Sequence, residues 1–288
     1  MTKERIAVIG GDKRLKHLID IFRAEGHSVC AFGVMGATDQ APSLSQALQN
    51  VSSVILPYPI SPDGVYLSSS EGECRVRLDT LFSEIARTEN VRVYGGGIKE
   101  SVRQTACAHG IELTDYATSE ALQIKNALCT AEGAIEVAMG ELDITLSGAV
   151  FTVIGYGRIG SLLGKRLTAL GARVYAVTRS KEKLAAAFCD GCIPFGTERL
   201  SDCISISDAV FNTAPATVLD KERLPYISKG CPVIDLASAP GGVDTEEAKR
   251  LGIKVIWALS LPGKYSPKTA ASIIADAVRE HFDRTRNR

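Results

Sequence analysis

The stretch Phe151-Thr152-Val153-Ile154-Gly155-Tyr156-Gly157-Arg158-Ile159-Gly160 decides the fold of the second half of the chain. Apolar and β-branched residues run directly into a G-x-G-x-x-G pattern, and a segment with helical periodicity follows it up to Gly171. Another apolar run ends at Val177 and completes a strand, a helix and a strand of the length that a βαβ unit needs. In this context the pattern predicts a bound dinucleotide rather than a structural glycine turn.

Each glycine of the pattern has its own task in such a unit. Gly155 permits the tight turn, Gly157 lets a pyrophosphate approach the backbone, and Gly160 allows the helix to pack closely on the strand. Backbone amides at the start of the helix, around Arg158 and Ile159, donate hydrogen bonds to the phosphates. The Arg158 side chain either contacts a phosphate of the cofactor or is a solvated surface arginine.

The residues after the second strand of the unit indicate which dinucleotide binds. A carboxylate there accepts hydrogen bonds from the adenine ribose and repels a 2′-phosphate. This chain has Thr178, Arg179 and Ser180 instead, followed by Lys181, and its first carboxylate is Glu182. An arginine beside two hydroxyl groups can hold a phosphate by charge-assisted hydrogen bonds. We therefore predict NADP as the cofactor in preference to NAD.

Further loops follow strand ends, and in open α/β sheets ligands bind beyond the carboxyl ends of the strands. Asp235 ends an apolar strand and is either a buried structural carboxylate or a group that orients the nicotinamide or the substrate. A later loop carries Lys264 and Lys268, which either pair with an anionic substrate or lie in solvent. The residues that we expect beside the cofactor in these loops are Thr213, Ala214, Pro215, Asp235, Ala237 and Ser238.

The alternation of short apolar runs with helical segments continues along the whole chain and predicts parallel sheets covered by crossover helices. A chain of 288 residues is also near the size at which one core stops growing. We predict an α/β protein with an N-terminal flavodoxin- or Rossmann-like parallel sheet and a C-terminal six-stranded Rossmann domain. The predicted parts are residues 1–117, an interdomain helix and linker at 118–145, and a cofactor domain at 146–288. The last helix packs on the second domain or crosses back to the first.

The composition excludes several classes of protein. The chain has 33 basic and 33 acidic residues and a hydrophobic fraction of 45%. That balance is typical of a globular protein and argues against a mainly disordered chain. It also argues against nucleic acid or an acidic membrane surface as the principal partner. The chain has neither a run of 18 apolar residues nor a signal-peptide pattern, so we expect a cytoplasmic protein. Eight dispersed cysteines, with one lone Cys189-x-x-Cys192, predict reduced thiols and no metal site.

The first domain opens with Gly10-Gly11-Asp12, which lacks a third glycine and has an aspartate where a pyrophosphate would bind. It is not expected to bind a dinucleotide. Either Arg14 or Asp12 touches a substrate there, or the loop is a simple turn and helix cap. The irregular stretch 57–72 also follows a strand end, on the side where ligands bind.

No histidine occurs in the loops that follow the strands of the second domain. The four histidines are His17, His27, His109 and His281. Dehydrogenases that oxidise a hydroxy acid usually place a histidine beside the nicotinamide to take the hydroxyl proton. We therefore expect a reaction in which no alcohol is deprotonated as hydride leaves.

Several strings of the sequence resemble the family of the dipicolinate synthase A subunit, in the same order over nearly the whole chain. They are Val8 to Arg14, Thr130 to Gly133, Gly155 to Gly160, Asn212 to Pro215, Asp235 to Asp244, Leu261 to Gly263 and Pro267 to Ala270. The second domain is also similar to the cofactor domain of the D-isomer 2-hydroxyacid dehydrogenases. The missing histidine separates it from their chemistry.

The resemblance implies an NADP-dependent oxidation of dihydrodipicolinate, or of its hydrated precursor, to dipicolinate in the mother cell of a sporulating bacterium. The partner that it implies is a second, flavoprotein-like B subunit, and we expect a homo-oligomer. Cationic partners for the small dicarboxylate substrate are Arg14, Lys99, Lys264 and Lys268. Lys268 and Glu132 are the candidates for the catalytic base, with a helix-surface or hinge role as the alternative for Glu132. The rival functions are another NADP-dependent dehydrogenase of a small acid, or a non-catalytic nucleotide-binding protein of the complex.

Overall fold

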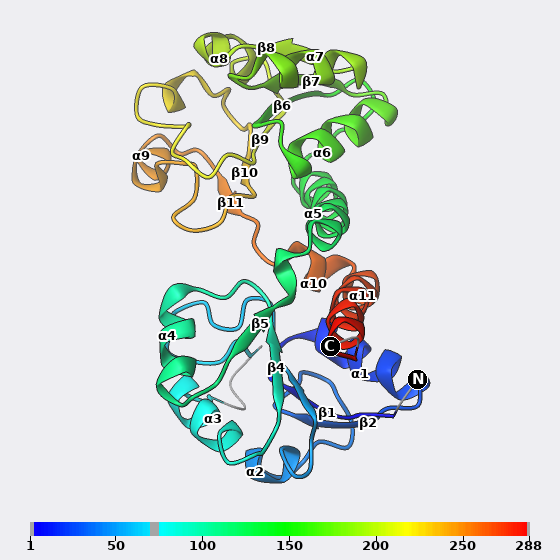
Figure 1. Cartoon of the computed structure of the whole chain (residues 1–288). Helices are drawn as coiled ribbons and strands as arrows, with labels where there is room; N and C mark the ends of the chain where they lie inside the picture. Colours follow the sequence, from blue (N-terminus) through cyan, green and yellow to red (C-terminus); the bar gives the residue numbers. More distant parts are fainter. Residues whose placement is uncertain (1–2, 70–74, 287–288) are drawn as a thin grey trace. The chain divides into compact units, whose positions relative to one another are not determined.

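The computed structural model describes residues 3–69 and 75–286, with side chains up to Phe282 (Figure 1). It forms two compact units, one of residues 1–126 with 266–288 and one of residues 127–265. The boundaries differ from the predicted ones because helix α5 (Glu120–Glu141) begins in the first unit and ends in the second. The last helix, α11 (Pro267–Arg286), crosses back to the first unit.

The first unit contains a parallel sheet of five strands in the order β2-β1-β3-β4-β5. The strands are β1 (Arg5–Ile9), β2 (Ser28–Phe32), β3 (Ser53–Ile55), β4 (Arg92–Gly95) and β5 (Leu113–Asp115). The helices are α1 (Lys13–Ala24), α2 (Leu44–Ala47), α3 (Leu78–Ile85) and α4 (Glu100–Ala108), with a 3₁₀ turn η1 (Tyr116–Thr118). This is the flavodoxin-like strand order, in which the direction of strand addition along the sheet reverses between β1 and β3.

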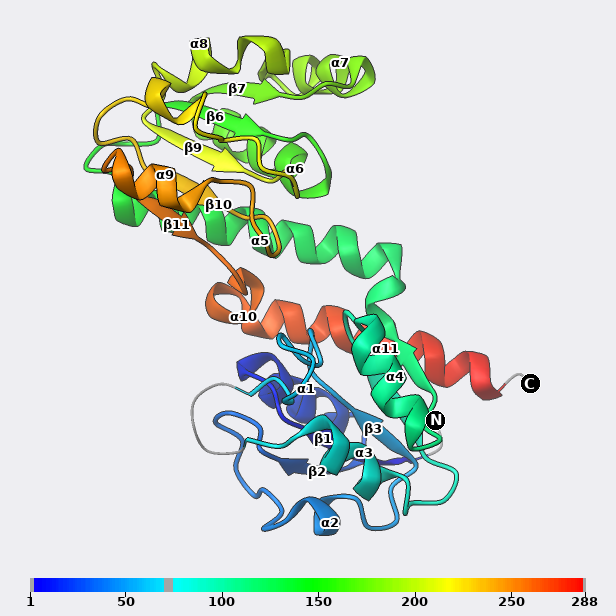
Figure 2. The same cartoon turned by 90° about the vertical axis from the view of Figure 1, so that its left-hand side faces the viewer.

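Helix α1 shows how the sequence builds this unit. Asp12 caps its first turn by accepting a hydrogen bond from the Arg14 amide, and apolar residues at helical spacing face the sheet. Helix α11 packs along α1, where Phe282 lies against Phe22 with 6.1 Å between ring centroids (Figure 2). Arg279 of α11 also pairs with Glu25 at the end of α1. The last helix therefore completes the covering layer of the first sheet.

The second unit contains a parallel sheet of six strands in the order β11-β10-β9-β6-β7-β8. The strands are β6 (Val150–Ile154), β7 (Arg173–Val177), β8 (Ile193–Phe195), β9 (Ala209–Asn212), β10 (Val233–Asp235) and β11 (Val255–Trp257). This is the doubly wound order of a dinucleotide-binding sheet, and it confirms the predicted fold class.

Short helices cover both faces of this sheet. They are α6 (Arg158–Ala169), α7 (Lys181–Cys189), α8 (Leu200–Ile204), α9 (Thr245–Arg250) and α10 (Leu261–Tyr265), with 3₁₀ turns η2 (Thr197–Arg199) and η3 (Leu224–Tyr226). One apolar cluster joins the sheet to α5, α6, α7 and α10, and another joins it to α8, α9 and η3. Because both faces are buried, the strands are apolar runs, and their carboxyl ends remain for ligands.

Candidate functional site

The glycine loop after β6 has the geometry that its sequence predicts. Gly155 has a φ of +86°, and a Cβ there would lie 2.6 Å from Oγ1 of Thr213. A Cβ on Gly160 would lie 2.1 Å from the carbonyl oxygen of Gly155, so only glycine lets α6 pack this closely. A Cβ on Gly157 would meet no described atom within 4 Å beyond its chain neighbours. The open space is therefore at the position where a diphosphate approaches the backbone.

The beginning of helix α6 favours an anion. Gly157 is its N-cap residue, and its first turn contains no acidic side chain. The first amides of the helix therefore present their partial positive charge without a competing carboxylate of the same turn. Arg158 is exposed, whereas Ile159 packs against the core of the unit.

Tyr156, between the first two glycines, holds this loop in place through its side chain. The sequence does not predict this role. The residue is only 4% exposed, and its hydroxyl donates a hydrogen bond of 2.8 Å to Oδ2 of Asp190. Lys165 of α6 pairs with the same carboxylate at 3.1 Å. Burial and the neighbouring Asp190 raise the pKa of the Tyr156 hydroxyl, which therefore stays a donor at neutral pH. The loop is thus tied to the turn that follows α7.

The carboxyl edge of the sheet is formed by one row of residues in register across all six strands. In spatial order the row is Trp257, Asp235, Asn212, Ile154, Val177 and Phe195. Ile154 is the last strand residue before the glycine loop. Neighbours in register share a face of a sheet, so this row fixes the starting points of the loops that surround the coenzyme position.

Asp235 has the contacts of a structural carboxylate. It is 3% exposed, and its Oδ1 accepts hydrogen bonds from Nδ2 of Asn212 at 2.8 Å and from the Ala237 amide at 3.0 Å. Its Oδ2 accepts a hydrogen bond of 2.8 Å from the Gly242 amide. Of the two predicted roles, these bonds favour the structural one, because they use the carboxylate to hold the loop 236–242 in place.

The loop after β9 lies against the glycine loop. Oγ1 of Thr213 is 3.0 Å from the Ile154 carbonyl oxygen and 3.2 Å from that of Gly155, so its hydroxyl donates within the protein. The Asn212 side chain bonds both the amide and the carbonyl group of Ala214. Pro215 is exposed. The structure thus places this predicted loop against the glycine loop, with Thr213 as a support of the glycine turn.

Trp257 is a second residue that the sequence reasoning missed at this edge. Its Nε1–H donates a hydrogen bond of 2.8 Å to the carbonyl oxygen of Ala237. Ala237 is buried, whereas Ser238 is exposed at the tip of the same loop. Trp257 is the neighbour of Asp235 in the row at the sheet edge. It therefore supports this loop from the outermost strand.

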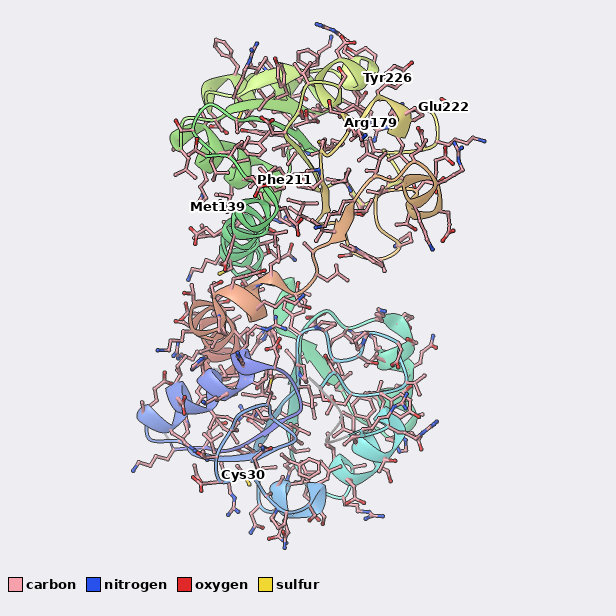
Figure 3. The ribbon with its side chains drawn as sticks, turned by 180° about the vertical axis from the view of Figure 1, so that it is seen from behind. Cys30, Met139, Arg179, Phe211, Glu222 and Tyr226 are labelled. Carbon is pink, nitrogen blue, oxygen red and sulfur yellow. The ribbon has the colours of Figure 1, made fainter. Side chains whose placement is uncertain are left out.

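The residues that follow β7 form one hydrogen bond that the sequence does not predict. Ser180 caps α7, and its hydroxyl donates a hydrogen bond of 2.6 Å to Oε2 of Glu182. That bond lowers the pKa of the Glu182 carboxyl group, so the group is ionised at neutral pH. Thr178 is buried, whereas Arg179 is exposed. Figure 3 labels Arg179 together with Phe211, a core residue of the same unit. A carboxylate is therefore bound to one of the hydroxyl groups predicted to hold a phosphate.

The glycine pair of the first unit is covered by its own chain. The Gly11 amide donates a hydrogen bond of 2.8 Å to the Ser68 carbonyl oxygen. A Cβ on Gly10 would lie 2.6 Å from Cδ2 of Leu67. The segment before residue 70 thus occupies the space above the turn, and Asp12 is used as the cap of α1. The absence of a dinucleotide at this turn stays a prediction.

Arg14 joins the loops after β1 and β3, the strands between which the sheet order reverses. Its Nε lies 2.9 and 3.1 Å from the two carboxylate oxygens of Asp12, and its Nη2 donates a hydrogen bond of 2.7 Å to the Tyr58 carbonyl oxygen. The residue is only 7% exposed. Its Nη1 forms no hydrogen bond with the residues that the structure describes. A buried guanidinium at a switch point is well placed for an anionic ligand.

The other predicted substrate and catalytic residues have varied surroundings. Lys99, the N-cap residue of α4, donates a hydrogen bond of 2.5 Å from Nζ to the Pro62 carbonyl oxygen. Glu132 on α5 is exposed and pairs with Nε of Arg166 at 3.3 Å, which is the contact of a helix-surface residue. Lys264 and Lys268 are both exposed, but Lys264 belongs to the second unit and Lys268 to the first.

All four histidines belong to the first unit. His27 is buried and accepts a hydrogen bond from the Glu4 amide on Nδ1 at 3.1 Å, and His109 lies 2.9 Å from a carboxylate oxygen of Asp79. Within the part of the chain that the structure describes, no three His, Cys, Asp or Glu side chains are grouped to hold a metal ion. None of the described helices is both long and apolar enough to cross a membrane.

Comparison with known proteins identifies the family. Residues 5–117 match the family model for the N-terminal domain of the dipicolinate synthase A subunit. Over 293 aligned residues the chain is 31% identical to the dipicolinate synthase A subunit of Bacillus subtilis (strain 168), covering 96% of this chain and 95% of the relative. The chain belongs to the dipicolinate synthase A subunit family. This confirms the resemblance that the sequence motifs carried.

Solved structures from this family share the whole fold. The crystal structure of the dipicolinate synthase A subunit from Bacillus halodurans has a TM-score of 0.83 at 27% identity and covers 96% of this chain and 97% of that one. The A chain of the Bacillus subtilis synthase has a TM-score of 0.83 at 28% identity, with 100% and 98% covered. Residues 117–239 also match the NAD binding domain of the D-isomer specific 2-hydroxyacid dehydrogenases. The second unit is therefore a dehydrogenase-type domain for a nicotinamide dinucleotide.

Proposed function

We propose that the chain catalyses the oxidation of dihydrodipicolinate, or of its hydrated precursor, to dipicolinate with NADP as the oxidant. The observation that carries the proposal is the glycine loop after β6, which is closed to a side chain at Gly155 and Gly160 and open at Gly157. The coenzyme supplies a hydride acceptor when it is bound there. The family name of the relatives supports the choice of product.

The residues around the loops of the second unit support aromatisation over oxidation of an alcohol. The histidines all belong to the first unit, and the Asp235 carboxylate is hydrogen-bonded within the sheet edge. Aromatisation of dihydrodipicolinate transfers one hydride with its electron pair to NADP⁺ and releases one ring proton, and the hydrated precursor also loses one water. The aromaticity gained by the pyridine ring supplies the driving force. Such a reaction needs no imidazole to take a hydroxyl proton as hydride leaves.

For the coenzyme we propose NADP over NAD, on the basis of Arg179. Its guanidinium group is exposed at the carboxyl end of β7, where the adenine ribose of a dinucleotide lies. The Glu182 carboxylate, bonded to Ser180, opposes this preference because it repels a 2′-phosphate. The guanidinium offers two or more donors to a phosphate, and Lys181 adds a second positive charge in the first turn of α7.

For the substrate carboxylates we propose Arg14 and Lys99 as partners. Nη1 of Arg14 carries two N–H donors in a site with little exposure, where a charge-assisted hydrogen bond is strongest. Lys99 uses one of its three protons on the Pro62 carbonyl and retains two. Lys264 is proposed as a further carboxylate partner because its ammonium group is exposed.

For removal of the ring proton we propose Lys268, acting as the neutral amine, before Glu132. Glu132 is paired with Arg166, whereas Lys268 forms no ion pair with the side chains that the structure describes. We also propose that the chain acts with the B subunit of the synthase in the mother cell of a sporulating bacterium, and that it forms a homo-oligomer. These proposals rest on the family relationship, whose members are named as one subunit of a synthase.

The test is an assay of the purified chain with dihydrodipicolinate and NADP⁺, followed by the absorbance of NADPH. We expect NADPH to form with dihydrodipicolinate but not with simple 2-hydroxy acids. Formation with hydroxy acids alone would favour a dehydrogenase of another small acid. Binding without turnover, both with and without the B subunit, would favour a non-catalytic nucleotide-binding role.

A further inference from the structure

Trp257 has an unusual place in the second unit. It is the only tryptophan of the chain, it ends the outermost strand β11, and it remains 44% exposed. The other large aromatic side chains in the sheet are either buried, as Phe151 and Phe211 are, or partly buried, as Phe195 is. The indole is nevertheless fixed at its polar end, because Nε1–H donates to the Ala237 carbonyl oxygen at 2.8 Å. Core packing does not account for an indole that is partly exposed and yet hydrogen-bonded through its N–H group.

The hydrogen bond connects Trp257 to one loop. The loop 236–242 begins after Asp235, which holds the Ala237 amide at 3.0 Å and the Gly242 amide at 2.8 Å. The Ala237 peptide is therefore held on one side by the Asp235 carboxylate and on the other by the Trp257 indole. A Cβ on Gly241 would lie 3.8 Å from the indole ring, at ordinary van der Waals contact distance. Between these fixed points only the tip of the loop is exposed.

The position of the loop in the sheet relates it to one half of the coenzyme. A doubly wound sheet consists of two mononucleotide-binding halves, and here β6, β7 and β8 form the first and β9, β10 and β11 the second. The glycine loop and Arg179 belong to the first half, which takes the adenosine side. Asp235 and Trp257 belong to the second half, which takes the nicotinamide side.

We propose that Trp257 is a positioning residue that fixes the loop 236–242 for the nicotinamide half of the coenzyme. The inference rests on the proposed function, since it requires a nicotinamide dinucleotide in the second unit. The indole contributes a donor that holds the Ala237 peptide, so that the Ser238 tip is presented in one orientation. Preorganisation of this kind raises affinity by lowering the cost of ordering the loop on binding.

The proposal predicts that Trp257 matters for one half of the coenzyme and not for the other. In the variant Trp257→Phe the aromatic ring is kept and the N–H donor is lost. We expect its affinity for NADP⁺ to fall about fivefold, as for one hydrogen bond of ordinary strength, with no change for 2′,5′-ADP, which lacks the nicotinamide half. Calorimetry with each ligand measures the two affinities separately. Trp257→Ala, which also removes the ring from beside Gly241, is expected to lose more affinity for NADP⁺ only.

Phe195 provides the matched control. It is the aromatic residue at the opposite end of the same row, on β8 of the adenosine half. Its ring packs edge-on against Tyr175 at 5.2 Å and lies under the Arg199 guanidinium at 4.4 Å. We expect Phe195→Leu to lower the affinities for NADP⁺ and for 2′,5′-ADP by the same factor, because both ligands carry the adenosine half.

The wild-type chain offers a second readout that needs no variant, because all tryptophan emission comes from Trp257. We expect NADP⁺ to change this emission and 2′,5′-ADP to leave it unchanged at saturation. Unchanged emission with NADP⁺ while calorimetry reports binding would overturn the proposal. An equal loss of affinity for NADP⁺ and for 2′,5′-ADP in Trp257→Phe would also overturn it. If the wild-type chain binds neither ligand, the proposed function fails, and this inference fails with it.

Discussion

At the scale of single residues, the adenosine end of the site holds two opposite charges. Arg179 is exposed at the carboxyl end of β7, and Glu182 is fixed to the Ser180 hydroxyl at 2.6 Å. The guanidinium attracts a 2′-phosphate, whereas the carboxylate repels it and accepts hydrogen bonds from a plain ribose. The proposed preference for NADP therefore depends on a balance between these two neighbouring side chains.

Replacing Arg179 by aspartate is expected to move the preference from NADP toward NAD. The change removes the donors to the phosphate and adds a second carboxylate beside Glu182, so the ratio of the two affinities shifts tenfold or more, about the value of one charge-assisted bond. Calorimetry with both coenzymes measures the ratio. Arg173→Asp, at the amino end of the same strand, is the matched control. An unchanged ratio in Arg179→Asp would refute the phosphate role.

The cysteines give a prediction that depends on burial. Cys107 and Cys189 are exposed, whereas Cys203 and Cys231 are buried. Burial raises the pKa of the Cys231 thiol to about 12 and also raises that of Cys203, so at neutral pH both stay protonated and unreactive. We expect a thiol reagent to label Cys107 and Cys189 before Cys203 and Cys231 in the native chain, which peptide mapping by mass spectrometry can measure. Early labelling of Cys231 would contradict the described burial.

At the scale of elements, the glycine loop separates binding from folding. Gly157 lies open at the beginning of α6, whereas Gly160 packs against the Gly155 carbonyl. A methyl group at Gly157 takes the space of the diphosphate, and a methyl group at Gly160 pushes the helix from the strand. The same motif thus contains one position that serves the ligand and another that serves the fold.

Two alanine substitutions test this separation. We expect Gly157→Ala to keep the thermal stability of the chain but to lose at least tenfold in coenzyme affinity. Gly160→Ala is expected to lower the stability of the second unit by about 1–3 kcal/mol, the usual cost of overpacking. Thermal unfolding and calorimetry on both variants provide the comparison. Equal stability losses in the two variants would show that the open space at Gly157 does not exist.

At the scale of the whole molecule, the sequence predicts more of the fold than of the site. Both parallel sheets and the glycine loop follow from local patterns, because the periodicity of apolar residues sets each element. The sequence does not predict which unit α11 packs on, because the apolar side of this helix could cover either sheet. The bond between Ser180 and Glu182 and the support from Trp257 depend on side-chain directions that spacing does not fix. Lys264 and Lys268 are close in sequence but belong to different units.

The return of α11 to the first unit has a measurable consequence. Phe282 is 3% exposed, and its ring lies 5.3 Å from that of Tyr94 and 6.1 Å from that of Phe22. We expect Phe282→Ala to destabilise the first unit by about 3–5 kcal/mol through the cavity it leaves. Circular dichroism follows both units, whereas the emission of Trp257 reports on the second unit alone. A shift of the tryptophan transition of the same size would contradict the assignment of α11 to the first unit.

The central claim is that the open glycine loop of the second unit binds a phosphorylated nicotinamide dinucleotide. Titration calorimetry of the purified chain with NADP⁺ and with NAD⁺ tests it most directly, with Gly157→Ala as the comparison. We expect NADP⁺ to bind, to bind more tightly than NAD⁺, and to lose this binding in Gly157→Ala while the variant stays folded. No heat of binding from either coenzyme at millimolar concentration, or full binding by Gly157→Ala, would contradict it.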